Sequence, residues 1–182
     1  MPRLPADIKE LIKNLSRKEL EEIVLKSASK EQSILNFIII NYLDKETGEK
    51  ELFEKAKADL DVLFAKRYKG QVEQIQLANM MTVAMKRVNE FTKVSKNKVL
   101  ETDLILYVLA VPFSIDESIF GTCFTAFDSK VVQIVKRLIT LVTTKLHPDY
   151  LADYQDTITD YLFTLHKRSG FLDAVYNLPN KI

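Results

Sequence analysis

Apolar side chains recur along this chain at intervals of three and four residues, which is the spacing of one face of an α-helix. Short polar breaks separate the periodic segments, and no two neighbouring segments alternate as the strands of a hairpin would. The pattern predicts an all-α protein with about nine helices. We place the helices at about residues 6–14, 17–28, 30–43, 51–69, 72–94, 99–112, 115–147, 148–169 and 171–178.

Three predicted helix starts carry the S-x-x-E/Q spacing of a capping box, in which two side chains satisfy free backbone amides of the first turn. A polar stretch around Gly48 predicts a break, and Gly70 is a typical residue to follow a helix. Pro112 should end its helix, because a proline ring cannot sit in the helix interior. The three boxes are Ser16 with Glu19, Ser29 with Gln32, and Ser114 with Glu117.

The segment at 30–43 is apolar in nearly every direction around its predicted helix, as the run FIII at 37–40 illustrates. A helix that is apolar all round is buried on several sides. We therefore expect a central helix or an interface helix here. A strand is the alternative, because β-branched residues cluster in this segment.

Composition supports a single helical domain. The chain has 182 residues, and its four glycines and five prolines are few for a sandwich or a Rossmann-like sheet. We predict one domain over residues 1–182, in which residues 1–28 form a short helical pair packed on the rest. Both a multi-helix bundle and an irregular HEAT-like stack of helix pairs fit the pattern.

Charge and the lengths of apolar runs argue against several classes of protein. The formal net charge is +1, without the basic excess usual in nucleic-acid-binding proteins. The apolar runs fall short of the roughly 20 residues that a bilayer span needs, and the N-terminus lacks the apolar core of a signal peptide. We therefore expect a cytoplasmic protein without membrane association, and we expect no cofactor.

Candidate catalytic and metal-binding residues are few. Cys123 is the single cysteine, and Phe120, Phe124 and Phe127 stand three and four residues from it. This spacing favours a buried, unreactive thiol on one helical stripe over a catalytic thiol. The two histidines lack the H-E-x-x-H and E-x-x-H spacings, so we expect no metal site.

Most clusters of Lys and Arg, such as residues 66–69 and 93–98, lie at predicted helix C-termini, where cations complement the helix dipole. Two Lys-Arg pairs lie in the middle of predicted helices instead. If these helices are neighbours, the four cations share a face and form a candidate basic patch for nucleic acid. The patch consists of Lys86, Arg87, Lys136 and Arg137.

Aspartates and tyrosines line one face of the predicted helix at 148–169. Like charges at helical spacing repel one another, so three interpretations stay open: a solvated face, a surface for a basic partner, and an internal match to the Lys-Arg pairs. We expect exposed carboxylates with partly exposed tyrosines beside them, because burying unpaired carboxylates is costly. The candidate partner-binding residues are Asp153, Asp156, Asp160, Tyr154 and Tyr161.

The segment LIKNLSRKELEEIVLK, from Leu11 to Lys26, has the pattern L-x-x-L-S-x-x-E-L and precedes all-helical sequence. In this it resembles uncharacterised bacterial helical proteins that are grouped as a domain of unknown function. The resemblance implies a bacterial cytosolic origin and an all-α fold. It implies no activity and no site residues.

These observations favour a non-enzymatic helical module for protein interaction or scaffolding, with an unknown protein partner and a homo-oligomer also open. The alternative is a nucleic-acid-binding helical protein that uses the mid-helix Lys-Arg pairs. An enzyme that uses Cys123 or the aspartates is less favoured, because no base and nucleophile stand at a recognisable spacing.

Overall fold

The structure is a computed structural model that describes residues 4–66 and 72–182, without the side chains of Lys45 and Glu46. It is 81% helical, and the described residues form nine α-helices and no strand, which confirms the all-α prediction. The predicted helix end at Gly70 and most of the basic cluster at 66–69 lie outside the described residues. The α-helices are α1 (Ala6–Lys13), α2 (Arg17–Lys30), α3 (Gln32–Ile38), α4 (Lys45–Phe64), α5 (Glu73–Val94), α6 (Lys98–Phe113), α7 (Thr125–Thr144), α8 (Leu151–Ser169) and α9 (Asp173–Tyr176).

The chain divides into two compact units, residues 1–49 and residues 50–182, and the division falls within α4. The N-terminal unit contains α1, α2, α3 and a π-helical segment, η1 (Ile39–Leu43). The C-terminal unit contains most of α4 and all of α5 to α9. The predicted packing of residues 1–28 on the rest of the chain stays a prediction.

The capping boxes of the N-terminal unit have opposite outcomes. The first is confirmed: the Ser16 hydroxyl accepts from the Glu19 amide at 3.3 Å, and the Ser16 amide donates to the Glu19 carboxylate at 2.8 Å. The second is wrong, because α2 continues past Ser29, whose hydroxyl donates to a carbonyl one turn earlier at 2.9 Å. The extended backbone of Glu31 then separates α2 from α3, without a side-chain cap.

The predicted break at Gly48 is also wrong, because α4 runs through it. A Cβ atom at this position would lie 2.9 Å from Cγ2 of Ile39. Glycine therefore lets the segment before α4 approach the helix closely, which is a second common use of this residue.

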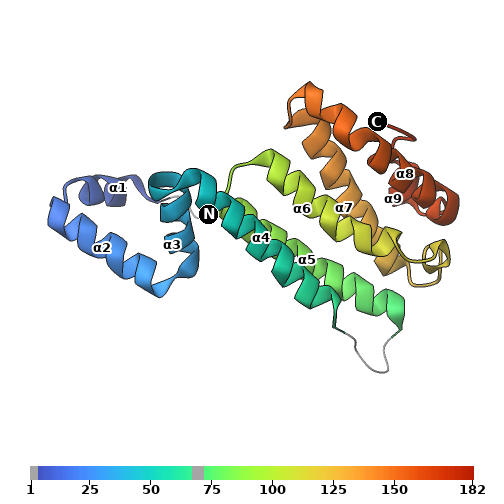
Figure 1. Cartoon of the computed structure of the whole chain (residues 1–182), viewed down its shortest axis with the longest axis horizontal. Helices are drawn as coiled ribbons and strands as arrows, with labels where there is room; N and C mark the ends of the chain where they lie inside the picture. The colour runs from blue at the N-terminus through green and yellow to red at the C-terminus, as the bar shows by residue number, and fades with distance from the viewer. Residues whose placement is uncertain (1–3, 67–71) are drawn as a thin grey trace. The chain divides into compact units, whose positions relative to one another are not determined.

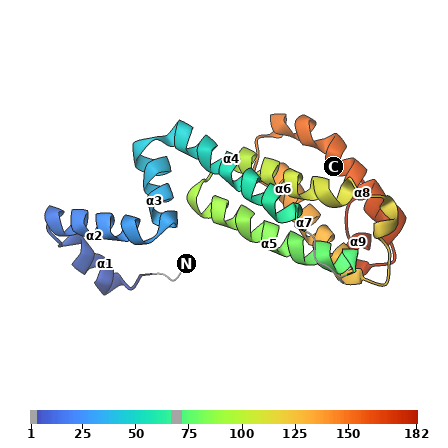
Figure 2. The same cartoon turned by 60° about the horizontal axis from the view of Figure 1, so that its bottom comes forward.

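The C-terminal unit is built around α6, which carries apolar side chains on nearly every side. Helices α5, α6 and α7 contact one another, and α8 packs on α7 (Figure 1 and Figure 2). The rings of Phe53 and Phe91 meet edge to face at 6.2 Å and join α4 to α5. The centre of the core is formed by α6 side chains with no exposed surface, namely Leu104, Ile105, Val108 and Leu109.

The predicted helix end near Pro112 is confirmed, because α6 ends at Phe113, but the loop that follows differs from the prediction. Pro112 lies buried in the last turn of α6, where the lost amide costs the helix only one hydrogen bond. The third predicted capping box is wrong, because Ser114 ends α6. Asp116 instead caps a short 3₁₀ turn, η2 (Glu117–Ile119).

Replacing Ser16 with alanine should lower the stability of α2 by about 1 kcal/mol, because an N-cap hydrogen bond is lost. Replacing Ser29 with alanine should change it by less than about 0.5 kcal/mol, because its hydroxyl only bonds a carbonyl within the helix. Amide hydrogen exchange in α2 measures both effects. Equal losses at the two positions would contradict the observed helix boundary.

Candidate functional site

The predicted aspartate face lies on α8, and its carboxylates are exposed as expected. Asp153, Asp156 and Asp160 are all open to solvent. Within the described residues none of them forms an ion pair, so the internal match to the Lys-Arg pairs is not observed. Their role in binding a partner stays a prediction.

The two candidate tyrosines of α8 have different outcomes: Tyr161 is partly exposed as expected, and Tyr154 is not. Tyr154 is buried, not partly exposed, because it falls four residues before Ile158 on the core stripe. Its hydroxyl donates to Asp103 at 2.9 Å, and burial together with this hydrogen bond raises the pKa of Tyr154. Tyr161 is half-buried and stacks on Phe113 with 3.9 Å between ring centroids, and burial raises its pKa too. The aspartate face of α8 therefore carries exposed carboxylates with Tyr161 partly exposed beside them.

The two mid-helix Lys-Arg pairs do lie on neighbouring helices, α5 and α7. Both lysines are exposed, but both arginines have carboxylate partners. Arg87 pairs with Glu90 at 2.9 Å, and Arg137 pairs with Glu101 at 2.7 Å. Two of the four cations in the candidate basic patch are thus already neutralised locally.

Arg137 joins three helices at a buried carboxylate. Its guanidinium donates to Asn89 of α5 at 2.6 Å and to Glu101 of α6 at 2.7 Å. Lys98 donates to the other oxygen of the same carboxylate at 2.7 Å, and the Glu101 side chain is only 5% exposed. Burial alone would raise the pKa of Glu101, but the hydrogen bonds and charges of Lys98 and Arg137 hold this pKa below its ordinary value.

Cys123 is exposed, so the prediction of a buried thiol on a helical stripe is wrong. The helix that was expected to carry it begins only at Thr125. Gly121 takes a φ of 70°, which interrupts helical geometry before the cysteine. Phe120 and Phe127 still pack on each other, with 5.2 Å between ring centroids.

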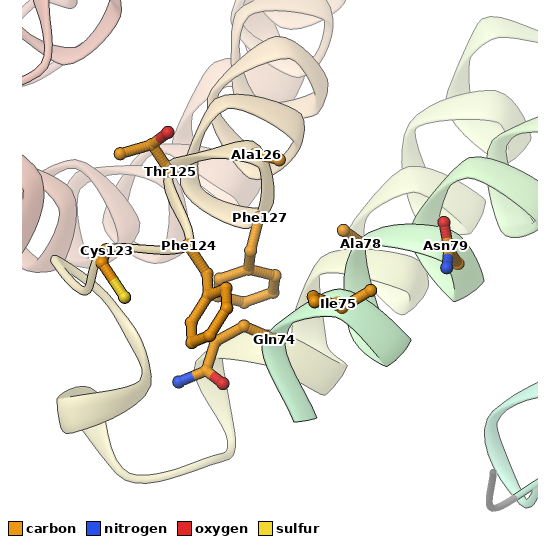
Figure 3. Close-up of a pocket in the computed structure, with 9 residues that line it drawn as sticks. All are labelled: Gln74, Ile75, Ala78, Asn79, Cys123, Phe124, Thr125, Ala126 and Phe127. Atoms are coloured by element: carbon orange, nitrogen blue, oxygen red, sulfur yellow. The ribbon is translucent and has the colours of Figure 1, made fainter. Parts of the chain in front are cut away.

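A cavity of about 330 Å³ opens beside Cys123 (Figure 3). Its walls are mainly apolar, with the rings of Phe124 and Phe127 on one side and Ile75 and Ala78 of α5 on the other. The described residues that line it include no histidine and no charged side chain. The cavity therefore offers the thiol neither a base nor a cation to stabilise a thiolate.

A second buried carboxylate fastens the loop before α7 to the end of α8. Asp128 is fully buried, and its Oδ1 accepts hydrogen bonds from the Gly121 amide at 2.9 Å and from the Ser169 hydroxyl. A Cβ at Gly121 would lie 2.1 Å from the carbonyl oxygen of Arg168, so glycine is required for this contact. Glu117 adds an ion pair with Arg168 at 2.9 Å. These contacts hold the fold together.

The N-terminal unit exposes an unusual number of large apolar side chains. Ile40 is the single buried side chain among those described between residues 4 and 49. Of the eighteen large apolar side chains that are exposed in the described chain, ten lie in this unit. We call these ten the N-terminal apolar surface: Leu4, Ile8, Leu11, Ile12, Ile23, Val24, Leu25, Phe37, Tyr42 and Leu43.

The expectation of a central helix at 30–43 is wrong, because α3 contains no buried residue and η1 contains only Ile40. The alternative of an interface helix agrees with the exposure of Phe37, Tyr42 and Leu43. The sequence signal for this surface is that the segment is apolar on all sides. This signal predicts that the helix is buried, but it does not identify the element or partner that covers it.

Other kinds of site find no support in the part of the chain that the structure describes. No three His, Cys, Asp or Glu side chains come together there as metal ligands would. No described helix combines the length and the apolar character needed to cross a membrane. Comparisons of the chain with models of protein families, with curated proteins and with solved structures found no match.

The Glu101 junction should make stability depend on pH. A carboxylate whose folded pKa is depressed stabilises the fold above its unfolded pKa, and this contribution is lost as pH falls through the folded value. Glu101→Gln should therefore cost about 1 to 3 kcal/mol at pH 7, and the cost should shrink below about pH 4.5, the ordinary value. Urea unfolding of both proteins from pH 7 to pH 3 measures this difference. The exposed Glu90→Gln is the matched control and should change stability little.

Cys123 should react in the native protein with a thiol reagent at a rate within about tenfold of a free cysteine peptide, because its side chain is exposed. Adding denaturant should change that rate little. Cys123→Ser should cost less than about 0.5 kcal/mol, as surface substitutions usually do. A native rate that rises sharply on unfolding would show that the thiol is packed after all.

Proposed function

We propose that this protein is a helical protein-interaction module that holds its partner through the N-terminal apolar surface. The observation that carries the proposal is the imbalance within the N-terminal unit. Ten large apolar side chains are exposed there, and Ile40 is the one side chain described as buried. Apolar exposure on this scale marks a binding surface more often than a surface that stays in water.

The lengths of the N-terminal helices support the same conclusion. Helix α1 has 8 residues and α3 has 7, and isolated helices below about 12 to 15 residues are marginal in water. Short helices are normally stabilised by packing an apolar face on something else. Neither α1, α2 nor α3 contains a buried residue, so a partner surface is the missing element.

Helix α1 has the amphipathic pattern of a helix that binds in a groove. Ile8, Leu11 and Ile12 follow the i, i+3, i+4 spacing of one face, and all three are exposed. Four charged residues alternate with them and keep the other faces polar, namely Asp7, Lys9, Glu10 and Lys13. Anchors at this spacing are typical of helix-in-groove recognition.

The alternative functions have less support. Nucleic-acid binding would use a patch in which Arg87 and Arg137 already have carboxylate partners, on a chain with a net charge of +1. Catalysis by Cys123 would need a base, and none of the described residues that line its cavity can act as one. The aspartate face of α8 suits a basic partner by charge, and we keep it as a second candidate contact.

Polar substitutions at the three most exposed leucines of this surface test the proposal. The triple variant Leu11→Ser, Leu25→Ser, Leu43→Ser changes side chains that are 63, 71 and 73% exposed. It should lose most chemical crosslinking to partners in a lysate of the source cells, while the free energy of unfolding of the C-terminal unit changes by less than about 0.5 kcal/mol. A stability loss instead would show that the surface is packed within the chain and would refute the proposal.

The matched control is Phe163→Ser with Phe171→Ser, which removes side chains that are 64 and 62% exposed in the C-terminal unit. This variant should keep its crosslinks. Equal crosslinking by the triple variant and the control would also refute the proposal. Asp156→Asn with Asp160→Asn tests the second candidate contact in the same assay and should weaken capture without lowering stability.

A further inference from the structure

Helix α2 carries an apolar stripe whose middle stays exposed in the described chain, while its ends at Leu20 and Ser27 are partly buried. Leu20, Ile23 and Val24 follow the i, i+3, i+4 spacing of one helix face, and Ser27 continues it. The side chains of Ile23 and Val24 are 50 and 47% exposed, although they lie in the middle of the helix. Leu25 lies on the opposite face of the helix and is not part of this stripe.

Charged residues on one flank of this stripe change sign along the helix. Glu19 lies on that flank near the N-terminus of α2, and Lys26 and Lys30 lie on it near the C-terminus, seven and eleven residues later. All three side chains are exposed, although Lys26 pairs with Glu22 at 2.5 Å and the Glu19 carboxylate also accepts from the Ser16 amide, so Lys30 is the cation of this flank with no ion pair in the described chain. On the other flank Arg17 and Glu21 already pair with each other at 2.8 Å. The acid-first, base-last flank is the feature that points to a particular partner.

We propose that the partner on α2 is a second copy of this chain, with the two α2 helices packed antiparallel across a two-fold axis. Ile23 and Val24 of both copies form the centre of the contact, and Glu19 of each copy faces Lys26 and Lys30 of the other. This inference rests on the proposed interaction function and names the partner for one part of the N-terminal apolar surface.

The register follows from the stripe. With the axis between Ile23 and Val24, Glu19 of one copy lies opposite Ala28 of the other, midway between Lys26 and Lys30. Each lysine is then offset by two residues, or about 3 Å along the helix, which is within reach of a lysine side chain. A parallel two-fold pair would instead place this flank against the other flank of the partner, where Arg17 and Glu21 already pair with each other, so the opposite charges of Glu19 and Lys30 meet only in the antiparallel arrangement.

A closed two-fold contact also suits the order of charges along α2. The two copies present the same patch to each other, so a patch must be complementary to itself. The stripe of α2 is complementary in this sense, because its charged flank is acidic before the centre of the stripe and basic after it. Stable dimers bury about 800 Å² on each side, so α2 alone is a small contact. Exposed α1 residues such as Ile8 and Leu11 extend the apolar area available.

Charge reversal tests this pairing with the full chain in solution. Lys30→Glu alone and Glu19→Lys alone each place like charges opposite one another twice in the dimer. Each single variant should therefore self-associate at least about tenfold more weakly than the original protein in sedimentation velocity measured over a range of concentrations. An equimolar mixture of the two variants should recover most of the original association, because positions 19 and 30 then carry opposite charges at both contacts.

Recovery on mixing is the decisive result, since neither misfolding nor a general loss of affinity would produce it. Glu19→Gln is a second variant, which keeps a side chain suited to the capping box but removes the charge; it should weaken association without loss of helical circular dichroism. Lys18→Glu is the matched control on the opposite face of α2 and should leave the association constant within about twofold of the original.

A protein that is monomeric at all concentrations, or single variants that associate as well as the original, would overturn the inference. Such a result would leave the proposed function standing if the triple variant Leu11→Ser, Leu25→Ser, Leu43→Ser still lost its crosslinks to other proteins. If the protein were monomeric and the triple variant also kept its crosslinks, the proposed function would be refuted as well. The two proposals can therefore fail separately.

Discussion

Helix α6 can be buried only if other helices cover it on several sides, because its apolar side chains point in nearly every direction. This requirement brings α5 and α7 against it, and α8 then covers α7. Glu101 places a carboxylate in the first turn of the same helix, where burial without a partner would be costly. Arg137 meets that carboxylate and also reaches Asn89, so one buried charge aligns three helices.

The N-terminal unit, in contrast, buries almost none of its apolar side chains within the described residues. Its helices have good local signals, such as the capping box of Ser16 and Glu19, but almost no tertiary burial within the described residues. Local signals contribute about 1 kcal/mol at a helix end, whereas burying a large apolar side chain contributes about 1.5 to 3 kcal/mol. A unit that leaves ten such side chains exposed therefore gains little stability from apolar burial within the described residues.

The chemistry of the chain is consistent with a role in binding. Its buried charged groups, Glu101 and Asp128, are held by hydrogen bonds that connect helices and loops, which is a structural use. The exposed thiol of Cys123 faces an apolar cavity whose described walls hold no base or cation. The mid-helix arginines Arg87 and Arg137 form ion pairs with Glu90 and Glu101. The exposed apolar side chains of the N-terminal unit and the aspartates of α8 are the features not used within the described chain.

The sequence by itself determined the helices, because apolar periodicity and capping act over three to eleven neighbouring residues. It predicted the all-α class, the Ser16 cap and the exposure of Asp153, Asp156 and Asp160. Only the tertiary structure decided which apolar faces are covered: Tyr154 became buried, and Cys123 became exposed once Gly121 turned the chain. It also decided that Arg137 meets Glu101, 36 residues away. Such outcomes depend on which helices become neighbours, and periodicity along one helix says that a face will be buried without saying by what.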